Sequence, residues 1–248
     1  MRRRCARAIA CCALAWLAAA CAGTGAFGGA APRRVALLPL GVVAPLPPEV
    51  LAGALPLERE LARYLAERGL AVDATSLPDA RAAWIRSAQA LKNESGTAGM
   101  SFDGAARLLA RELHAASGVD ALVVPWVAMR PAQMKGRMVA WDGVARELER
   151  YRGRRAGMDD ARYLDALEGS FAAPSLQVAV FSAQGEKLFE GTGGLDLVQD
   201  VLLVGDKQAG FRVEMPPRDE IFTDAALLRE GVALALDPYP GWPPARGR

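Results

Sequence analysis

The chain contains few residues suited to metal binding or nucleophilic catalysis. It has one histidine, His114, and four cysteines, all within the first 21 of its 248 residues. A zinc site needs three or four suitable ligands, and His114 lies near the end of a predicted helix, where a partly cationic ring favours the helix dipole. The motifs of serine hydrolases, zinc proteases and phosphate loops are missing as well. The sequence therefore predicts no cofactor, no metal and no catalytic residue, and favours a protein that is not an enzyme.

Long apolar runs and a strong charge imbalance are also missing beyond the first 21 residues. No later run reaches the ~20 apolar residues that a spanning helix requires. Lysine and arginine number 30 against 28 acidic residues, and four of the arginines lie in the first seven positions. The remainder is thus slightly acidic, which predicts no nucleic-acid partner. Hydrophobic residues make up 52% of the chain, enough for a sizeable core.

The amino-terminal stretch indicates export. Arginines at positions 2, 3, 4 and 7 precede thirteen small or apolar residues, Ala8–Ala20, and Cys21 follows. At ~1.5 Å per residue this run covers roughly 20 Å of a hydrocarbon core about 30 Å thick. A cationic head, a short apolar segment and a small-residue cleavage site predict a signal peptide over residues 1–20.

Cys21 would be the first residue and the single cysteine of the mature chain, so it has no partner for an intramolecular disulfide. The segment Leu17–Cys21 (LAAAC) resembles the lipobox of bacterial lipoproteins, although Ala18 stands where that family prefers leucine. The resemblance implies lipid attachment at Cys21, by a diacylglycerol on the thiol and a further acyl chain such as palmitate on the amine. Ala22 in place of aspartate implies the periplasmic face of the outer membrane of a Gram-negative bacterium. The alternative is an ordinary secretory signal with an incidental cysteine.

After a tether over residues 21–33, apolar runs predict strands at 34–40, 70–76 and 120–129 and helices at 57–68, 78–91 and from 101 to about 117. A helical insertion is expected over 131–173, with one helix opened by Asp142 and another after Asp159. A hairpin of strands 174–182 and 187–192, an edge strand at 211–215, and a helix capped by Thr223 follow. The expected fold class is α/β: a single domain over 34–236 with a mixed, mostly parallel sheet covered by helices. Residues 237–248 are expected to form a loose, proline-rich tail.

Three groups of residues are candidates for function. A basic cluster is expected to form a solvated helix end, or a contact for an anionic polymer or lipid headgroup: Arg146, Arg150, Arg152, Arg154 and Arg155. Carboxylates could pair for acid–base hydrolysis: Asp73, Asp120, Asp142, Glu190 and Asp196. A large aromatic and a glycine-rich strand exit are expected to serve the core, or an interface if both are exposed: Trp141, Asp142, Gly193 and Gly194.

The order of four segments resembles a known α/β domain. These are RVALLPL, ELARYLAERGLAV, GVDALVVPWV and the hairpin SLQVAVFSAQGEKLFEG, between Arg34 and Thr192. The domain is shared by the curli-secretion lipoprotein, the penicillin-binding-protein activator lipoproteins and the amino-terminal domain of the Tol translocation protein. The resemblance implies a non-catalytic binding or assembly module of the cell envelope, anchored to the membrane through Cys21, with an envelope protein or glycan as partner. The alternatives are an envelope hydrolase using clustered carboxylates and a homo-oligomeric, secretion-associated lipoprotein.

Overall fold

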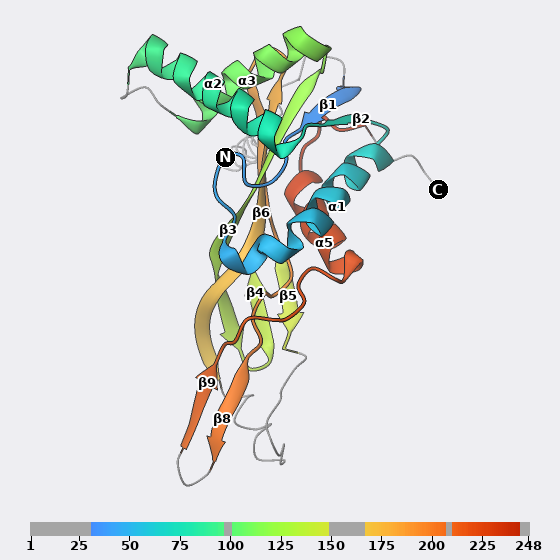
Figure 1. Cartoon of the computed structure of the whole chain (residues 1–248). Helices are drawn as coiled ribbons and strands as arrows, with labels where there is room; N and C mark the ends of the chain where they lie inside the picture. The colour runs from blue at the N-terminus through green and yellow to red at the C-terminus, as the bar shows by residue number, and fades with distance from the viewer. Residues whose placement is uncertain (1–30, 97–100, 149–166, 207–209, 244–248) are drawn as a thin grey trace, which may run out of the picture. The chain divides into compact units, whose positions relative to one another are not determined.

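Figure 1 shows the helices and strands of the computed structural model, which describes residues 31–96, 101–148, 167–206 and 210–243. By its contacts the chain divides after Ala30, and every described element belongs to the second unit. The strands are β1 Arg34–Leu37, β2 Ala71–Ala74, β3 Ala121–Lys135, β4 Met138–Trp141, β5 Val144–Glu147, β6 Glu168–Ser182, β7 Lys187–Gly194, β8 Leu202–Asp206 and β9 Gly210–Glu214. The helices are the short 3-10 helix η1 Pro48–Gly53, α1 Ala54–Glu67, α2 Leu77–Ser95, α3 Phe102–Ser117 and α5 Ala225–Leu236.

The main sheet is mixed. Its order is β2-β1-β3-β4-β5, and the other edge of β3 pairs with β6, which in turn pairs with β7. The expected α/β class is therefore confirmed. The expectation of a mostly parallel sheet is wrong, because β1 pairs in parallel with β2 and β3 while the other pairings within this sheet are antiparallel. Tight turns join β3 to β4, β4 to β5 and β6 to β7, and such turns produce antiparallel pairs.

The two longest strands, β3 and β6, have fifteen residues each and lie at the centre of the sheet. Their pairing runs without a break from Ala121 opposite Ser182 to Lys135 opposite Glu168. The other edge of β3 pairs with β1 over residues 121–123 and with β4 over residues 133–135. Between these two pairings the edge of β3 has no partner strand in the described part of the chain.

Successive apolar side chains in and just after β1 point to opposite faces of the sheet. The sheet around β1 therefore has a hydrophobic core on each face. Val35 and Leu37 lie with α1 and α5 on one face, whereas Ala36 and Leu38 lie with α2 and α3 on the other. Helices cover both faces, as Figure 1 shows. A third core lies farther along β3, where Trp141 and other residues of β4 and β5 pack with Leu197 and Val201.

The helix predicted from residue 101 and the hairpin predicted after residue 174 are confirmed. Ser101 accepts a hydrogen bond from the Gly104 N–H at 3.1 Å and begins α3, and Gly118 ends this helix with a φ of +70°. The predicted hairpin after residue 174 turns at Gly185, whose φ is +82°. Each position needs either a side-chain acceptor or a left-handed backbone, and the residue present provides it.

The predicted helical insertion is wrong wherever the structure describes it. Residues 131–135 and 168–173 continue the long strands β3 and β6, and residues 144–147 form strand β5 rather than a helix. Asp142 and Gly143, with φ of +35° and +86°, form the two-residue turn between β4 and β5. Asp-Gly is a preferred sequence for such a turn. The helix predicted after Asp159 lies largely outside the described residues.

Several predicted details of the later chain need correction. The strand predicted at 211–215 exists, but it pairs with β8 in a separate two-stranded sheet. Asp224, not Thr223, caps the last helix, since its carboxylate accepts the Ala226 N–H at 2.8 Å. Ala226 itself is exposed, and the buried face of α5 consists of Leu228, Gly231, Val232, Ala235 and Leu236.

The carboxyl-terminal segment is packed up to residue 243, in contrast to the loose tail that was expected. Tyr239 and Trp242 are buried and their rings meet edge to face at 4.8 Å between centroids. The Tyr64 hydroxyl of α1 donates to Asp237, which also pairs with Arg68. Burial, followed by the hydrogen bond to Asp237, raises the pKa of Tyr64. The beginning of the segment is therefore held to α1.

None of the helices within the described ranges has the length and apolarity that a bilayer span requires.

Candidate functional site

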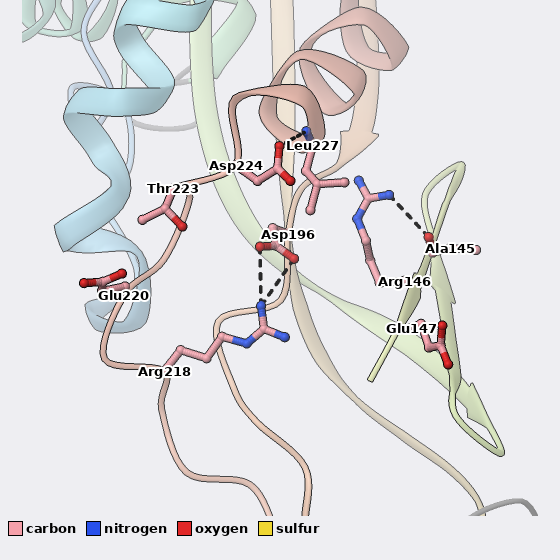
Figure 2. A pocket seen from close by; sticks show the side chains of 9 residues that line it. All are labelled: Ala145, Arg146, Glu147, Asp196, Arg218, Glu220, Thr223, Asp224 and Leu227. Carbon is pink, nitrogen blue, oxygen red and sulfur yellow. Dashed lines mark hydrogen bonds and ion pairs between the residues drawn. The ribbon is translucent and has the colours of Figure 1, made fainter. Parts of the chain in front are cut away.

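A polar cavity of about 390 Å³ lies where β5, the segment after β7 and the first turn of α5 come together (Figure 2). Ligand cavities in proteins commonly have volumes of roughly 300–1,000 Å³. Nine residues line it: Ala145, Arg146, Glu147, Asp196, Arg218, Glu220, Thr223, Asp224 and Leu227. Six of the nine are charged, two arginines and four acidic residues.

Arg146 occupies an inward-facing position of strand β5. It stands between the buried residues Val144 and Leu148, and it is itself only 7% exposed. Its Nη1 donates to a carboxylate oxygen of Glu230 at 2.7 Å and to the Ala145 carbonyl at 3.3 Å. A position that the strand pattern assigns to an apolar side chain thus holds a guanidinium group.

The other edge of the same guanidinium has no partner. Nε and Nη2 of Arg146 are buried and make no hydrogen bond within the described structure. Figure 2 shows that this edge faces the side of the cavity formed by Leu227 and Asp224. A buried donor without an acceptor costs about 1–3 kcal/mol, and more when it is charged. Among the described residues, Arg146 therefore has two parallel N–H donors that are unused and buried beside the cavity.

Asp224 contributes the opposing negative charge. One carboxylate oxygen accepts the N–H groups of Ala226 and Leu227 at 2.8 and 3.3 Å, which fixes the side chain at the start of α5. The second oxygen makes no hydrogen bond among the described residues and projects toward the interior of the cavity in Figure 2. Asp224 thus caps the helix with one oxygen and leaves the other available.

Arg218 is paired with two carboxylates on the other side of the cavity. Its Nε contacts Asp200 at 3.0 Å, and its Nη1 lies 3.4 Å from both oxygens of Asp196. All three side chains are largely buried. This cluster joins the two segments that lead into and out of the β8–β9 hairpin, and its guanidinium is neutralised by the paired carboxylates.

The five carboxylates singled out in the sequence do not form one site, and Asp196 alone among them lines the cavity. Asp120 accepts the N–H groups of Arg33 and Arg34 at 2.8 and 2.9 Å. The hydrogen bond from Arg33 lowers the pKa of Asp120, burial opposes this shift, and the hydrogen bond from Arg34 adds to it. The others each have a cationic partner: Asp73 with Arg34, Asp142 with Arg130, Glu190 with Lys187, and Asp196 with Arg218.

The basic cluster of the sequence is represented here by one residue. Arg146 lies in a strand and is buried, so the expected solvated helix end is wrong for this residue. Arg150, Arg152, Arg154 and Arg155 lie outside the described residues. Recognition of strand β5 would have placed Arg146 on the inner face, because the even-numbered residues 144, 146 and 148 alternate with exposed ones.

The candidate interface residues are adjacent but not exposed. The Gly194 N–H donates to the Asp142 carbonyl at 3.0 Å, and Trp141 Nε1 donates to the Pro174 carbonyl at 3.0 Å. Trp141, Gly193 and Gly194 are all buried. These three residues pack inside the protein, so the expectation that they form an exposed interface is wrong.

Gly193 is required by the close approach of α5. A Cβ atom at this position would lie 2.1 Å from the Gly231 carbonyl oxygen and 2.9 Å from the Ala235 nitrogen. Both are backbone atoms of the helix, so the helix would have to move away from β7 to accommodate a side chain.

His114 and Cys21 complete the set of predicted residues. The His114 ring is exposed, and its Nδ1 lies 2.8 Å from the Val119 carbonyl oxygen, next to the end of α3. Within the described ranges no three histidine, cysteine or acidic side chains gather as metal ligands would. Cys21 lies outside the described residues.

A second cavity, of about 300 Å³, lies beside α2 and α3 and is lined mainly by apolar side chains, among them Trp84, Leu91 and Phe102. Trp84, Ala88 and Leu91 of α2 are half buried, while Ala80, Ala83 and Ser87 of the same helix are buried. This cavity has no charged side chain in its lining.

When the chain is compared with protein-family models and with curated proteins, it matches none of them.

Proposed function

We propose that this chain is a non-catalytic binding module of the cell envelope, held by lipid on Cys21 at the periplasmic face of the outer membrane. The observation that carries the binding role is the cavity at Arg146. Two buried N–H donors of Arg146 have no partner among the described residues. Of the other ionisable groups that line the cavity, Asp196 and Arg218 form an ion pair and Asp224 caps α5. A catalytic carboxylate pair needs two groups free to exchange protons, whereas Asp196 is bound to Arg218.

The membrane attachment is inferred from the amino-terminal sequence. Burial of acyl chains contributes about 0.8 kcal/mol per methylene, so one medium chain binds weakly and several long chains bind durably. Lipid on the first residue of the mature chain would hold the α/β domain near the bilayer surface. From there the domain would bind an envelope protein or glycan.

Metabolic labelling with an alkyne analogue of palmitate tests the attachment. We expect the wild-type chain to be labelled and to fractionate with the outer membrane, and the Cys21→Ser variant to be unlabelled. Cys12→Ser is the matched control, because Cys12 lies within the predicted signal peptide and its loss should leave labelling unchanged. An unlabelled wild-type chain in the soluble periplasmic fraction would contradict the proposal.

Crosslinking in intact cells tests the binding role. We expect the wild-type chain to give a discrete adduct with an envelope component, and the adduct to weaken when Arg146 is replaced by lysine. An adduct pattern that contains this chain alone would instead support a homo-oligomer.

A further inference from the structure

We infer that the Arg146 cavity binds a small zwitterion, a free α-amino acid or a dipeptide, with its carboxylate on Arg146 and its ammonium group at Asp224. This inference deepens the proposed function, because it rests on the cavity being a binding site. It does not depend on the lipid anchor.

The free edge of the guanidinium selects a carboxylate. Nε and Nη2 of Arg146 present two parallel N–H donors, and a carboxylate offers two oxygens at matching positions. The third nitrogen already donates to Glu230, which holds the plane of the group in place. An incoming carboxylate would satisfy both unused donors in one contact.

The charge of the lining calls for a positive group on the same ligand. Two guanidinium groups face four carboxylates in this lining, and Arg218 is neutralised by Asp196 and Asp200. A dianion such as phosphate would meet an excess of negative charge, and a simple cation would leave the two free donors of Arg146 without an acceptor, since the charge of Arg146 is already paired with Glu230. A zwitterion places opposite charges on opposite sides, with its ammonium near the unused oxygen of Asp224.

A saccharide fits this lining less well. Its hydroxyl groups would satisfy the donors singly, without the two-oxygen match that the guanidinium edge offers. None of the nine lining residues is aromatic, so no flat apolar face is present for a sugar ring to stack on. Saccharide binding is therefore an outcome of the test that would contradict the inference.

Leu227 lies beside the buried donors in the lining. Nε and Nη2 are shielded from solvent, and in Figure 2 the Leu227 side chain lies between the Asp224 carboxylate and the guanidinium. Leu227 is partly exposed in the first turn of α5. Binding of a carboxylate therefore requires side chains that cover this edge to move.

Calorimetric titration of the full-length protein in mild detergent tests the inference. The probes are L-alanine and L-alanyl-L-alanine, and the comparison ligands are propionate, ethylamine and glucose. We expect saturable binding of at least one zwitterion and weaker binding of each comparison ligand. Arg146→Lys keeps the charge but loses the parallel donors, so it should weaken binding by about tenfold or more.

Asp224→Asn is the second variant. Asparagine caps a helix about as well as aspartate, so the fold should persist while the charge that holds the ammonium group is lost. We expect a similar loss of affinity with little change in Tm. The matched control is Arg229→Lys, which alters an ion pair of the same helix with Glu67, outside the lining, and should leave binding unchanged.

Four results would overturn the inference: no binding of either zwitterion, equal binding of propionate and L-alanine, binding of glucose alone, or unchanged affinity in Asp224→Asn. If the wild-type chain is not labelled by the palmitate analogue but still binds L-alanine, only the lipid anchor is contradicted. The lipid anchor and the assignment of the ligand therefore fail independently.

Discussion

Replacement of Arg146 by methionine should stabilise the chain while it removes ligand binding. The position faces inward between Val144 and Leu148, and methionine resembles the arginine stem in length and flexibility. The substitution removes two buried donors that have no acceptor. It also breaks the ion pair with Glu230.

Removal of the two unsatisfied donors should stabilise the fold by more than loss of the Glu230 ion pair destabilises it. Each unsatisfied donor costs about 1–3 kcal/mol. The Glu230 side chain is 47% exposed, so its carboxylate regains hydration when the pair is broken, and an ion pair with such a partner is worth about 1 kcal/mol or less. The two donors together cost about 2–6 kcal/mol, so the free energy of unfolding should rise by at least about 1 kcal/mol. Replacements of buried ion pairs by apolar groups give gains of about 1–4 kcal/mol, which for a chain of this size corresponds to a rise in Tm of roughly 2–16 °C.

Thermal unfolding followed by circular dichroism measures this effect in the absence of ligand. Glu230→Gln is the matched control, because it breaks the same ion pair and leaves the guanidinium in place, so its Tm should fall slightly. If Arg146→Met melts below the wild type, the guanidinium supports the fold and the assigned cost of its free donors is wrong.

Three further predictions concern the fold. Gly193→Ala should lower the free energy of unfolding by about 1–3 kcal/mol through the clash with the Gly231 carbonyl, whereas Gly169→Ala, whose added Cβ would meet only a methionine methyl at 3.5 Å, should be nearly neutral in the same denaturation assay. Asp120 has a folded-state pKa below its ordinary 3.8, so it stabilises the fold above about pH 4 and this contribution is lost as the pH falls; the difference in Tm between wild type and Asp120→Asn should be present at pH 7 and shrink below pH 4, and a constant difference would contradict this. Trp242→Ala should cost roughly 3–5 kcal/mol because the ring is buried in the first core, and an unchanged urea midpoint would show that the tail does not support the fold.

Elements with strong local signals were predictable from the sequence. Val35 and Leu37 alternate with Ala36 and Leu38, and this pattern is enough to identify a strand covered on both faces. The cap at Ser101 and the left-handed glycines depend on a few neighbouring residues, so no tertiary information was needed. The long-range pairing of β3 with β6 over fifteen residues was not encoded in any local pattern.

The region after residue 131 was mispredicted because its apolar spacing fits two structures. Val144 and Leu148 are four residues apart, which places them on one face of a helix and equally on one face of a strand. Val139 and Trp141, two residues apart, fit a strand alone, and the Asp142-Gly143 pair indicates a hairpin turn. These signals together would have decided the question.

The same ambiguity between helix and strand explains why the candidate site could not be predicted from the sequence. In the sequence Arg146 belongs to a basic run, and its charge there predicts exposure. Once β5 is a strand, residue 146 belongs to the inner face and its charge becomes an exception that requires a partner. Asp224 and Arg218 meet Arg146 only through the tertiary fold, so no spacing in the sequence could have grouped them.

The unpaired edge of β3 affects how the protein behaves when it is concentrated near other copies. The Val123 carbonyl accepts the Leu38 N–H, so odd-numbered residues of β3 direct their backbone groups toward this edge. Pro125 and Pro131 are two of the four such residues between the pairings with β1 and β4, and neither has an N–H to donate. A foreign strand that added here would lose half of the donors it needs. Within the described structure, part of a long strand is thereby left open without offering a template for aggregation.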